Sequence, residues 1–178
     1  MTVFNVAGLL RESPGASRAH RLRDRYVALG PDIELAGPLN GTIRMQRTNR
    51  GILVRGEVEA PVRRTCARCL EPYVEAAQIA VSEEYLPSLD PESGAVLPEP
   101  AMDEEVRAID EHNEIDLGPV LREEFALAEP MLPLHDPNCA GLCPDCGEPL
   151  GPGHPPHEEA DIDPRLAGLW QLLERNDH

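Results

Sequence analysis

Five cysteines in two clusters constrain this chain more than any other feature of its sequence. Cys66 and Cys69 lie in TCARCLEP, and Cys139, Cys143 and Cys146 lie in NCAGLCPDCGEPL. Each cluster contains a Cys-x-x-Cys pair, and two such pairs supply the four thiolates of a closed tetrahedral zinc site. The sequence therefore predicts a structural Zn²⁺ ion held by Cys66, Cys69, Cys143 and Cys146, with Cys139 as an alternative ligand.

The second pair, in CPDCG, is the sharper of the two signals. Pro144 and Gly147 favour a tight turn in which backbone N–H groups point at the thiolates, and Gly147 tolerates a positive φ. A stretch of 73 residues separates Cys69 from Cys143. A zinc ion shared by the two pairs would therefore join distant parts of the chain.

Three histidines lie near the cysteines. His135 precedes Cys139 by four residues, so it is a further alternative ligand that would complete a Cys-His site. His154 and His157, in GHPPHEE, are interpreted as exposed loop residues rather than ligands.

Two other interpretations of the cysteines stay open. Cys143 and Cys146 form a pair of the kind that cycles through a disulfide, so the chain is alternatively a cytoplasmic thiol redox protein. Neither pair follows a strand and opens a helix, as a thioredoxin-like site requires. Free or disulfide-bonded cysteines are the remaining interpretation, although an odd cysteine count without a secretory signal disfavours an extracellular disulfide framework.

Length and hydropathy indicate where such a chain works. The 178 residues suffice for one domain with a core, or for one domain with long appendages. No apolar run approaches the length of a membrane span, and the N-terminal stretch does not resemble a signal peptide. We expect a cytoplasmic protein, in a reducing compartment where thiolates favour metal over disulfide.

Charge is distributed unevenly along the chain. Residues 1–70 carry 12 arginines and 6 acidic residues, whereas residues 71–178 carry 4 arginines and 26 acidic residues. The acidic half suits a basic protein partner better than a nucleic acid. The arginines either contact phosphate or form solvated faces that pair with the protein's own acids. Two groups of arginines are candidates for phosphate contact, namely Arg18, Arg21, Arg23 and Arg25, or Arg44, Arg47, Arg50 and Arg55.

Alternating apolar and polar residues predict an antiparallel sheet from residue 38 onward. Strands are expected at 39–47 and 52–63, joined by a turn, and again at 73–85. The first cysteine pair then lies where two strands meet, so the metal knuckle would serve as a hairpin turn.

The segments around this sheet are less regular. A strand is expected within residues 2–10, and a short one at 105–109 in an acidic, proline-rich loop over 87–114. A helix is expected over 116–129, with Asp116 as its cap, to cover one face of the sheet. A second amphipathic helix is expected to begin after Asp163 and to contain Leu166, Leu169, Trp170 and Leu173.

These patterns predict an α+β protein. It has an antiparallel β-sheet or partly open barrel covered by one or two helices, with a zinc-knuckle C-terminal segment. Residues 1–37 are an N-terminal strand and an arginine-rich segment with little regular structure, 38–135 the β-rich core, and 136–178 the cysteine-rich zinc segment and C-terminal helix. The sequence shows no phosphate-binding glycine loop, serine elbow or His-Glu-x-x-His helix, so we predict that the protein is not an enzyme.

Several motifs, taken in order, resemble one bacterial family. They are CARCLEP, EEYLP, EIDLGPVLREEFALAEPMLPLHDPNCAGLCPDCG and DPRLAGLWQLL. From about residue 30 onward the chain resembles the YceD family, the large ribosomal RNA subunit accumulation proteins. The resemblance implies a non-enzymatic factor that supports accumulation, processing or assembly of 23S ribosomal RNA and the large ribosomal subunit.

The same resemblance indicates the partners. They would be the large ribosomal subunit precursor, a ribosomal protein or an rRNA maturation factor. Direct contact with ribosomal RNA is expected through Arg44, Arg47, Arg50 and Arg55, and no membrane is involved.

Overall fold

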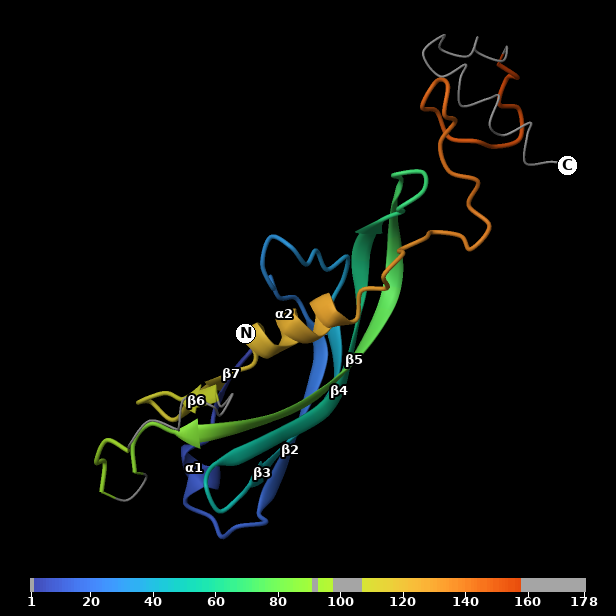
Figure 1. Ribbon diagram of the computed structural model, residues 1–178. Coiled ribbons are helices and arrows are strands. Elements are labelled where there is room, and N and C mark those ends of the chain that lie inside the picture. The colour runs from blue at the N-terminus through green and yellow to red at the C-terminus, as the bar shows by residue number, and fades with distance from the viewer. Residues whose placement is uncertain (1, 91–92, 98–106, 158–178) are drawn as a thin grey trace, which may run out of the picture. The chain divides into compact units, whose positions relative to one another are not determined.

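The computed structural model describes residues 2–90, 93–97 and 107–157. The chain forms two compact units, Met1–Cys139 and Ala140–His178. In chain order, the elements of the first unit are β1 (Val3–Asn5), α1 (Ala7–Leu10), β2 (Ser17–Arg25), β3 (Leu39–Arg47), β4 (Ile52–Thr65), β5 (Pro72–Pro87), β6 (Arg107–Ile109), β7 (Glu114–Asp116) and α2 (Gly118–Leu127) (Figure 1).

Five strands form one sheet in the order β2-β3-β4-β5-β6. All neighbours in this sheet are antiparallel except β5 and β6, which are parallel. The short strands β1 and β7 form a separate antiparallel pair. The predicted α+β class is therefore confirmed, with a sheet that is mixed rather than wholly antiparallel, while the partly open barrel stays a prediction.

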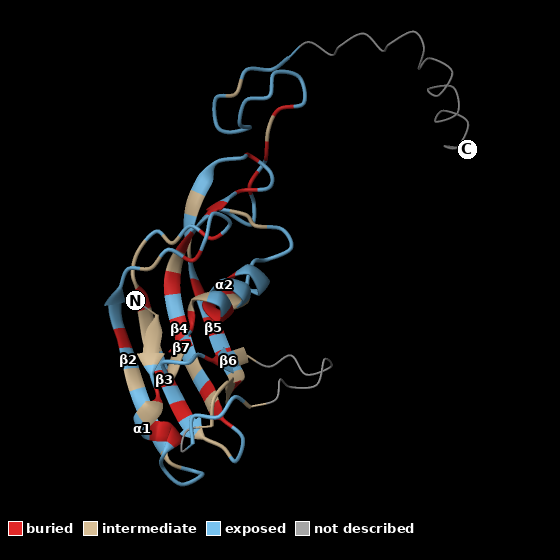
Figure 2. Ribbon diagram, turned by 90° about the vertical axis from the view of Figure 1, so that its left-hand side faces the viewer, coloured by how far each residue is buried: buried red, intermediate tan, exposed pale blue. Residues whose placement is uncertain are grey.

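The two longest strands are joined by the first cysteine pair. β4 and β5 pair without interruption from Ile52 opposite Tyr85 to Thr65 opposite Pro72. Buried residues alternate with exposed ones along both strands (Figure 2), as a sheet with one face on the core requires. The prediction that the cysteine knuckle is a hairpin turn is confirmed.

Helix α2 covers the buried face of the sheet. Its residues Val120, Leu121 and Phe125 are buried, and the helix packs against β5 (Figure 1). Asp116 supports its start, because its Oδ1 accepts a hydrogen bond from the Gly118 N–H at 2.8 Å. The predicted helix at this place is confirmed, although it begins at Gly118 and ends at Leu127, and its N-cap is Leu117 rather than the expected Asp116, which is the last residue of β7.

The N-terminal segment is more regular than the sequence predicted. β2 pairs with β3 from Ser17 to Leu22 and again at Arg25, with a register shift between them, although little regular structure was expected there. In β2 only Leu22 is buried, so this edge strand lacks the apolar alternation that reveals a strand in a sequence. The strand expected within residues 2–10 is instead β1 followed by the short helix α1, whose Leu9 and Leu10 are buried.

Between β5 and α2 the structure contains one strand that was predicted and one that was not. Strand β6 lies within the range expected for a short strand, whereas β7 was not predicted. Part of the acidic loop, at residues 91–92 and 98–106, lies outside the described residues.

The second unit is described over residues 140–157 and contains no helix or strand there. Its one sheet-like feature in that range is a bridge between Leu142 and Pro149. The helix expected after Asp163 lies outside the described residues, and the division at residues 37 and 135 stays a prediction. In the described part of the chain, no helix has the length and apolar character needed to cross a membrane.

Candidate metal centre

The turn between β4 and β5 brings two sulfurs together, and we call residues 66–71 the first knuckle. The Cys66 N–H donates to the Glu71 carbonyl at 2.9 Å, and the Leu70 N–H donates to the Cys66 carbonyl at 2.9 Å. Leu70 adopts a φ of +62°, which closes the turn in the left-handed region. This tight turn makes Cys66 and Cys69 neighbours at the end of the hairpin.

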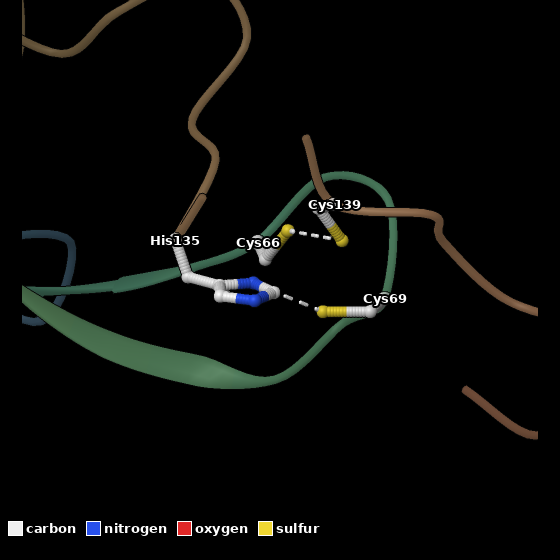
Figure 3. Close-up of side chains that lie close together, drawn as sticks. All are labelled: Cys66, Cys69, His135 and Cys139. Carbon is white, nitrogen blue, oxygen red and sulfur yellow. Dashed lines mark hydrogen bonds between the residues drawn. The ribbon is translucent and has the colours of Figure 1, made fainter. Parts of the chain in front are cut away.

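The segment that follows α2 supplies two more potential ligands, His135 and Cys139 (Figure 3). The Ala67 N–H donates to the Pro133 carbonyl at 2.8 Å, and Arg68 Nη1 donates to the Cys139 carbonyl at 2.8 Å. These hydrogen bonds hold the segment against the first knuckle. They bring together residues that are far apart in the sequence.

The donor atoms of Cys66, Cys69, His135 and Cys139, here called the first cluster, all lie within 4.8 Å of one another. The Sγ atoms of Cys66 and Cys139 are 3.8 Å apart, and Cys69 Sγ lies 3.3 Å from His135 Nδ1 (Figure 3). A tetrahedral zinc ion with Zn–S bonds of about 2.3 Å has sulfur–sulfur edges of about 3.8 Å. The first cluster therefore matches the geometry of a four-coordinate metal site.

The three sulfurs of the first cluster are buried, whereas His135 is exposed. Burial opposes ionisation of Cys66, but N–H groups that include those of Cys69 and His135 outweigh it and lower the pKa of Cys66 to about 5. The Glu71 N–H favours the Cys69 thiolate, yet burial and the neighbouring sulfurs raise the pKa of Cys69 to about 11. A bound cation would relieve this crowding, because it stabilises deprotonated thiols.

A second group of potential ligands lies within the second unit. The donor atoms of Cys143, Cys146, His154 and His157, here called the second cluster, also lie within 4.8 Å of one another. Cys146 Sγ is 3.3 Å from His154 Nε2. Cys143 is buried, whereas Cys146 and His157 are exposed. Each of the two clusters has a donor set that can bind a metal ion.

The four thiolates predicted as one site are thus divided between two clusters. Cys66 and Cys69 lie beside the two residues named as alternative ligands, and Cys143 and Cys146 lie beside two histidines. The shared four-thiolate site draws on both units, and it stays a prediction.

Sequence reasoning interpreted His154 and His157 as loop residues without a role as ligands. The structure places their ring nitrogens within 4.8 Å of the sulfurs of Cys143 and Cys146, and the sequence signal for this grouping is their spacing, 8 and 11 residues after Cys146. Cysteine and histidine pairs that are close in sequence are typical of local zinc sites. For His135 the corresponding signal was its position four residues before Cys139.

The four arginines expected to contact RNA lie in different environments. Arg44 and Arg55 are exposed and lie directly opposite each other on β3 and β4. Arg47 is partly buried and donates to three backbone carbonyl oxygens at 2.6 to 3.2 Å, so it supports the hairpin turn between these strands. Arg50 is exposed within that turn.

An open groove of about 490 Å³ crosses the exposed face of β3, β4 and β5. Among the residues that the structure describes, neither Arg44 nor Arg55 forms an ion pair, although two glutamates line the same groove. The polar residues of the groove are Asn40, Thr42, Arg44, Arg55, Glu57, Glu59 and Gln78.

Comparisons with known proteins cover most of the chain. A family model described as "Large ribosomal RNA subunit accumulation protein YceD" matches residues 54–173. Uncharacterized proteins of Mycobacterium bovis and Mycobacterium tuberculosis are each 37% identical over 142 residues, which is 79% of this chain and 65% of theirs. An uncharacterized protein of Mycobacterium leprae is 29% identical over 143 residues, 79% of this chain and 62% of its own. The chain thus spans less than two thirds of these relatives, and no solved structure matches it.

Proposed function

Because this chain belongs to the YceD family of large ribosomal RNA subunit accumulation proteins, we propose that it is a non-enzymatic cytoplasmic factor that supports accumulation of 23S ribosomal RNA. The observation that carries the proposal is the family match over residues 54–173. The factor would act during processing of this RNA or assembly of the large ribosomal subunit. Its partners would be the subunit precursor, a ribosomal protein or an rRNA maturation factor.

Zinc is the metal that suits the first cluster best. Three thiolates and one imidazole in tetrahedral arrangement are typical of structural zinc sites, and soft thiolate ligands disfavour magnesium and calcium. An ion held by Cys66, Cys69, His135 and Cys139 would tie the β4–β5 hairpin to the segment after α2. Its role would be architectural, because four protein ligands leave no open position for a substrate.

Ribosomal RNA contact is proposed at Arg44 and Arg55. Like charges directly opposite each other on a sheet repel, so a phosphate that lies between them stabilises the pair. Arg21 adds positive charge beside them. It lies on the neighbouring strand β2, opposite Thr42, two residues along from Ala19, which is opposite Arg44. Arg47 and Arg50 of the predicted set lie at the end of this hairpin, where Arg47 is already held by backbone carbonyls.

The acidic part of the chain favours a protein partner as well. Residues 71–178 contain 26 acidic residues against 4 arginines, and such a surface attracts basic proteins. A basic ribosomal protein or maturation factor is therefore the proposed partner on that side.

Binding to 23S ribosomal RNA fragments at low salt tests the RNA contact. Neutralising both arginines with Arg44→Ala and Arg55→Ala is expected to weaken binding about tenfold, and to reduce the slope of log affinity against log salt by about 2. The matched control is Arg18→Ala, since Arg18 is already paired with Glu12 at 2.6 Å. It should leave the affinity within about twofold.

Two outcomes would contradict the RNA contact. Absence of binding by the wild-type chain at low salt would leave only the protein partner. If Arg18→Ala costs as much log affinity as each arginine removed in the double variant, net charge rather than the groove attracts RNA.

The alternative function, a thiol redox protein that uses Cys143 and Cys146, is not favoured. The donor atoms of both cysteines lie within 4.8 Å of each other and of those of His154 and His157, and this donor set of two cysteines and two histidines supports shared metal coordination. A metal-free preparation with fully reactive thiols would reverse this preference.

A further inference from the structure

The second knuckle, residues 143–148, repeats the backbone of the first. The Cys143 N–H donates to the Glu148 carbonyl at 2.7 Å, and the Gly147 N–H donates to the Cys143 carbonyl at 2.9 Å. The fifth residue again has a positive φ, +75° at Gly147. These are the same two hydrogen bonds, and the same left-handed residue, that close the first knuckle.

The sequence repeats along with the backbone. Both knuckles read Cys-x-x-Cys-x-Glu-Pro, at residues 66–72 and 143–149. In each, the residue before the first cysteine pairs with the proline across the turn, Thr65 with Pro72 and Leu142 with Pro149. The second unit therefore contains a complete copy of the turn that presents two sulfurs in the first unit.

Two imidazoles complete the donor set without help from the first unit. His154 Nε2 lies 3.3 Å from Cys146 Sγ, and the rings of His154 and His157 have centroids 5.0 Å apart. Both separations are close to those of ligands that share one tetrahedral ion. Only two prolines separate the histidines, one residue fewer than in common zinc fingers, and these prolines keep the intervening backbone extended.

The described part of the second unit has little else to order it. Of residues 140–157, only Gly141 and Cys143 are buried. A segment with so few buried apolar groups does not repay the conformational entropy of ordering its backbone. Metal binding, worth on the order of 10 kcal/mol in small zinc modules, supplies the missing free energy.

We infer that Cys143, Cys146, His154 and His157 form a second, independent zinc site, so that each chain binds two zinc ions. This inference does not depend on the ribosomal RNA role. The two sites differ in access, because the first cluster buries three sulfurs and the second buries one. The second ion therefore exchanges faster with solvent and chelators than the first.

Zinc content of the purified full-length chain, measured by native mass spectrometry and elemental analysis, tests the inference. The wild-type chain is expected to hold two ions, and the double variant C143S/C146S one. H154A/H157A should also lose the second ion or bind it at least about tenfold more weakly. The matched control is His112→Ala, since this exposed histidine belongs to neither cluster.

Cobalt substitution adds a readout of ligand type. The wild-type spectrum should be the sum of a three-thiolate and a two-thiolate site, and C143S/C146S should leave only the three-thiolate component. The wild-type chain could instead hold one zinc ion that is lost both in C66S/C69S and in C143S/C146S. That result would overturn the inference in favour of the shared four-thiolate site. One zinc ion that survives C143S/C146S would also overturn it, and an unchanged second ion in H154A/H157A would refute the histidine ligands.

Discussion

The two knuckles have the same backbone hydrogen bonds but very different support. The first closes β4 and β5, which pair continuously from Ile52 opposite Tyr85 to Thr65 opposite Pro72. The second closes a single bridge between Leu142 and Pro149. The same turn therefore extends a large sheet in the first unit, whereas in the described part of the second unit it has little other regular structure around it.

The surroundings explain why this difference matters energetically. The first knuckle extends from a sheet whose core includes Val58, Val81 and Phe125, all at most 2% exposed. Burial of such side chains stabilises the first unit by about 1.5–3 kcal/mol each, whether or not a metal is bound. The described part of the second unit has no comparable apolar cluster. Removal of metal should therefore destabilise the described part of the second unit much more than the first unit.

Chelation provides the largest expected effect. Removing metal should expose the amides of Cys143 and Gly147 to rapid hydrogen exchange, because binding worth on the order of 10 kcal/mol is lost. The amides of Ile43 and Val58 in the sheet should keep their protection. Hydrogen exchange followed by mass spectrometry, with and without chelator, measures both sets in one experiment.

The chelated chain also offers a clear way to break the comparison. Equal loss of protection in the sheet would show that the first knuckle is as metal-dependent as the second. Retained protection at Cys143 and Gly147 would show that residues 140–157 are ordered by something other than metal.

A buried arginine predicts a smaller effect that is confined to the first site. The Arg64 side chain is 3% exposed, with Nε 2.8 Å from Glu75 and Nη1 3.4 Å from Glu129. Glu129 begins the segment that carries His135 and Cys139. Arg64→Met should therefore lower stability by about 1–3 kcal/mol and weaken metal binding at the first cluster, while the second cluster is unchanged.

The neighbouring Arg63→Met is the matched control. Arg63 forms its ion pair with Glu34 at 2.7 Å, and both side chains are largely exposed. Loss of this ion pair should lower the free energy of unfolding by less than about 1 kcal/mol and leave metal affinity at the first cluster unaltered. Metal competition titrations measure the affinities, and denaturant unfolding measures stability. If Arg63→Met and Arg64→Met weaken the first site equally, Arg64 has no special role in positioning that segment.

The parts of the fold that could be predicted are those with strong local signals. β3 and the β4–β5 hairpin follow from apolar residues at alternate positions, and Asp116 with Pro119 indicated the start of α2. β2 was missed because an exposed edge strand has no such alternation. Its pairing with β3 depends on contacts that only the folded chain makes.

The residue types of the candidate site could be predicted from the sequence, whereas their division into two clusters is visible only in the folded chain. Two Cys-x-x-Cys pairs pointed to zinc, yet four sulfurs alone do not show whether they share an ion. His135 reaches the first knuckle through long-range hydrogen bonds, such as that from Ala67 N–H to the Pro133 carbonyl. Both pairs were expected to form turns, but the repetition of Cys-x-x-Cys-x-Glu-Pro, which indicates two turns of the same kind, was not used.

The smallest expected effect concerns the residue with positive φ in each knuckle. Gly147 adopts a φ of +75°, and an added Cβ there would meet no atom within 4 Å, so a substitution is disfavoured by backbone conformation alone. Gly147→Ala should cost about 1 kcal/mol and weaken metal binding at the second cluster about fivefold. The counterpart is Leu70→Gly, since Leu70 already adopts a φ of +62° in a turn supported by two long strands. In Leu70→Gly, relief of the backbone strain stabilises the folded turn, whereas the greater freedom of glycine stabilises the unfolded chain. These two effects nearly cancel, so metal affinity at the first cluster should change less than about twofold. Metal competition on both variants measures the difference, and a loss at the first cluster as large as that at the second would show that the strands do not support the first knuckle.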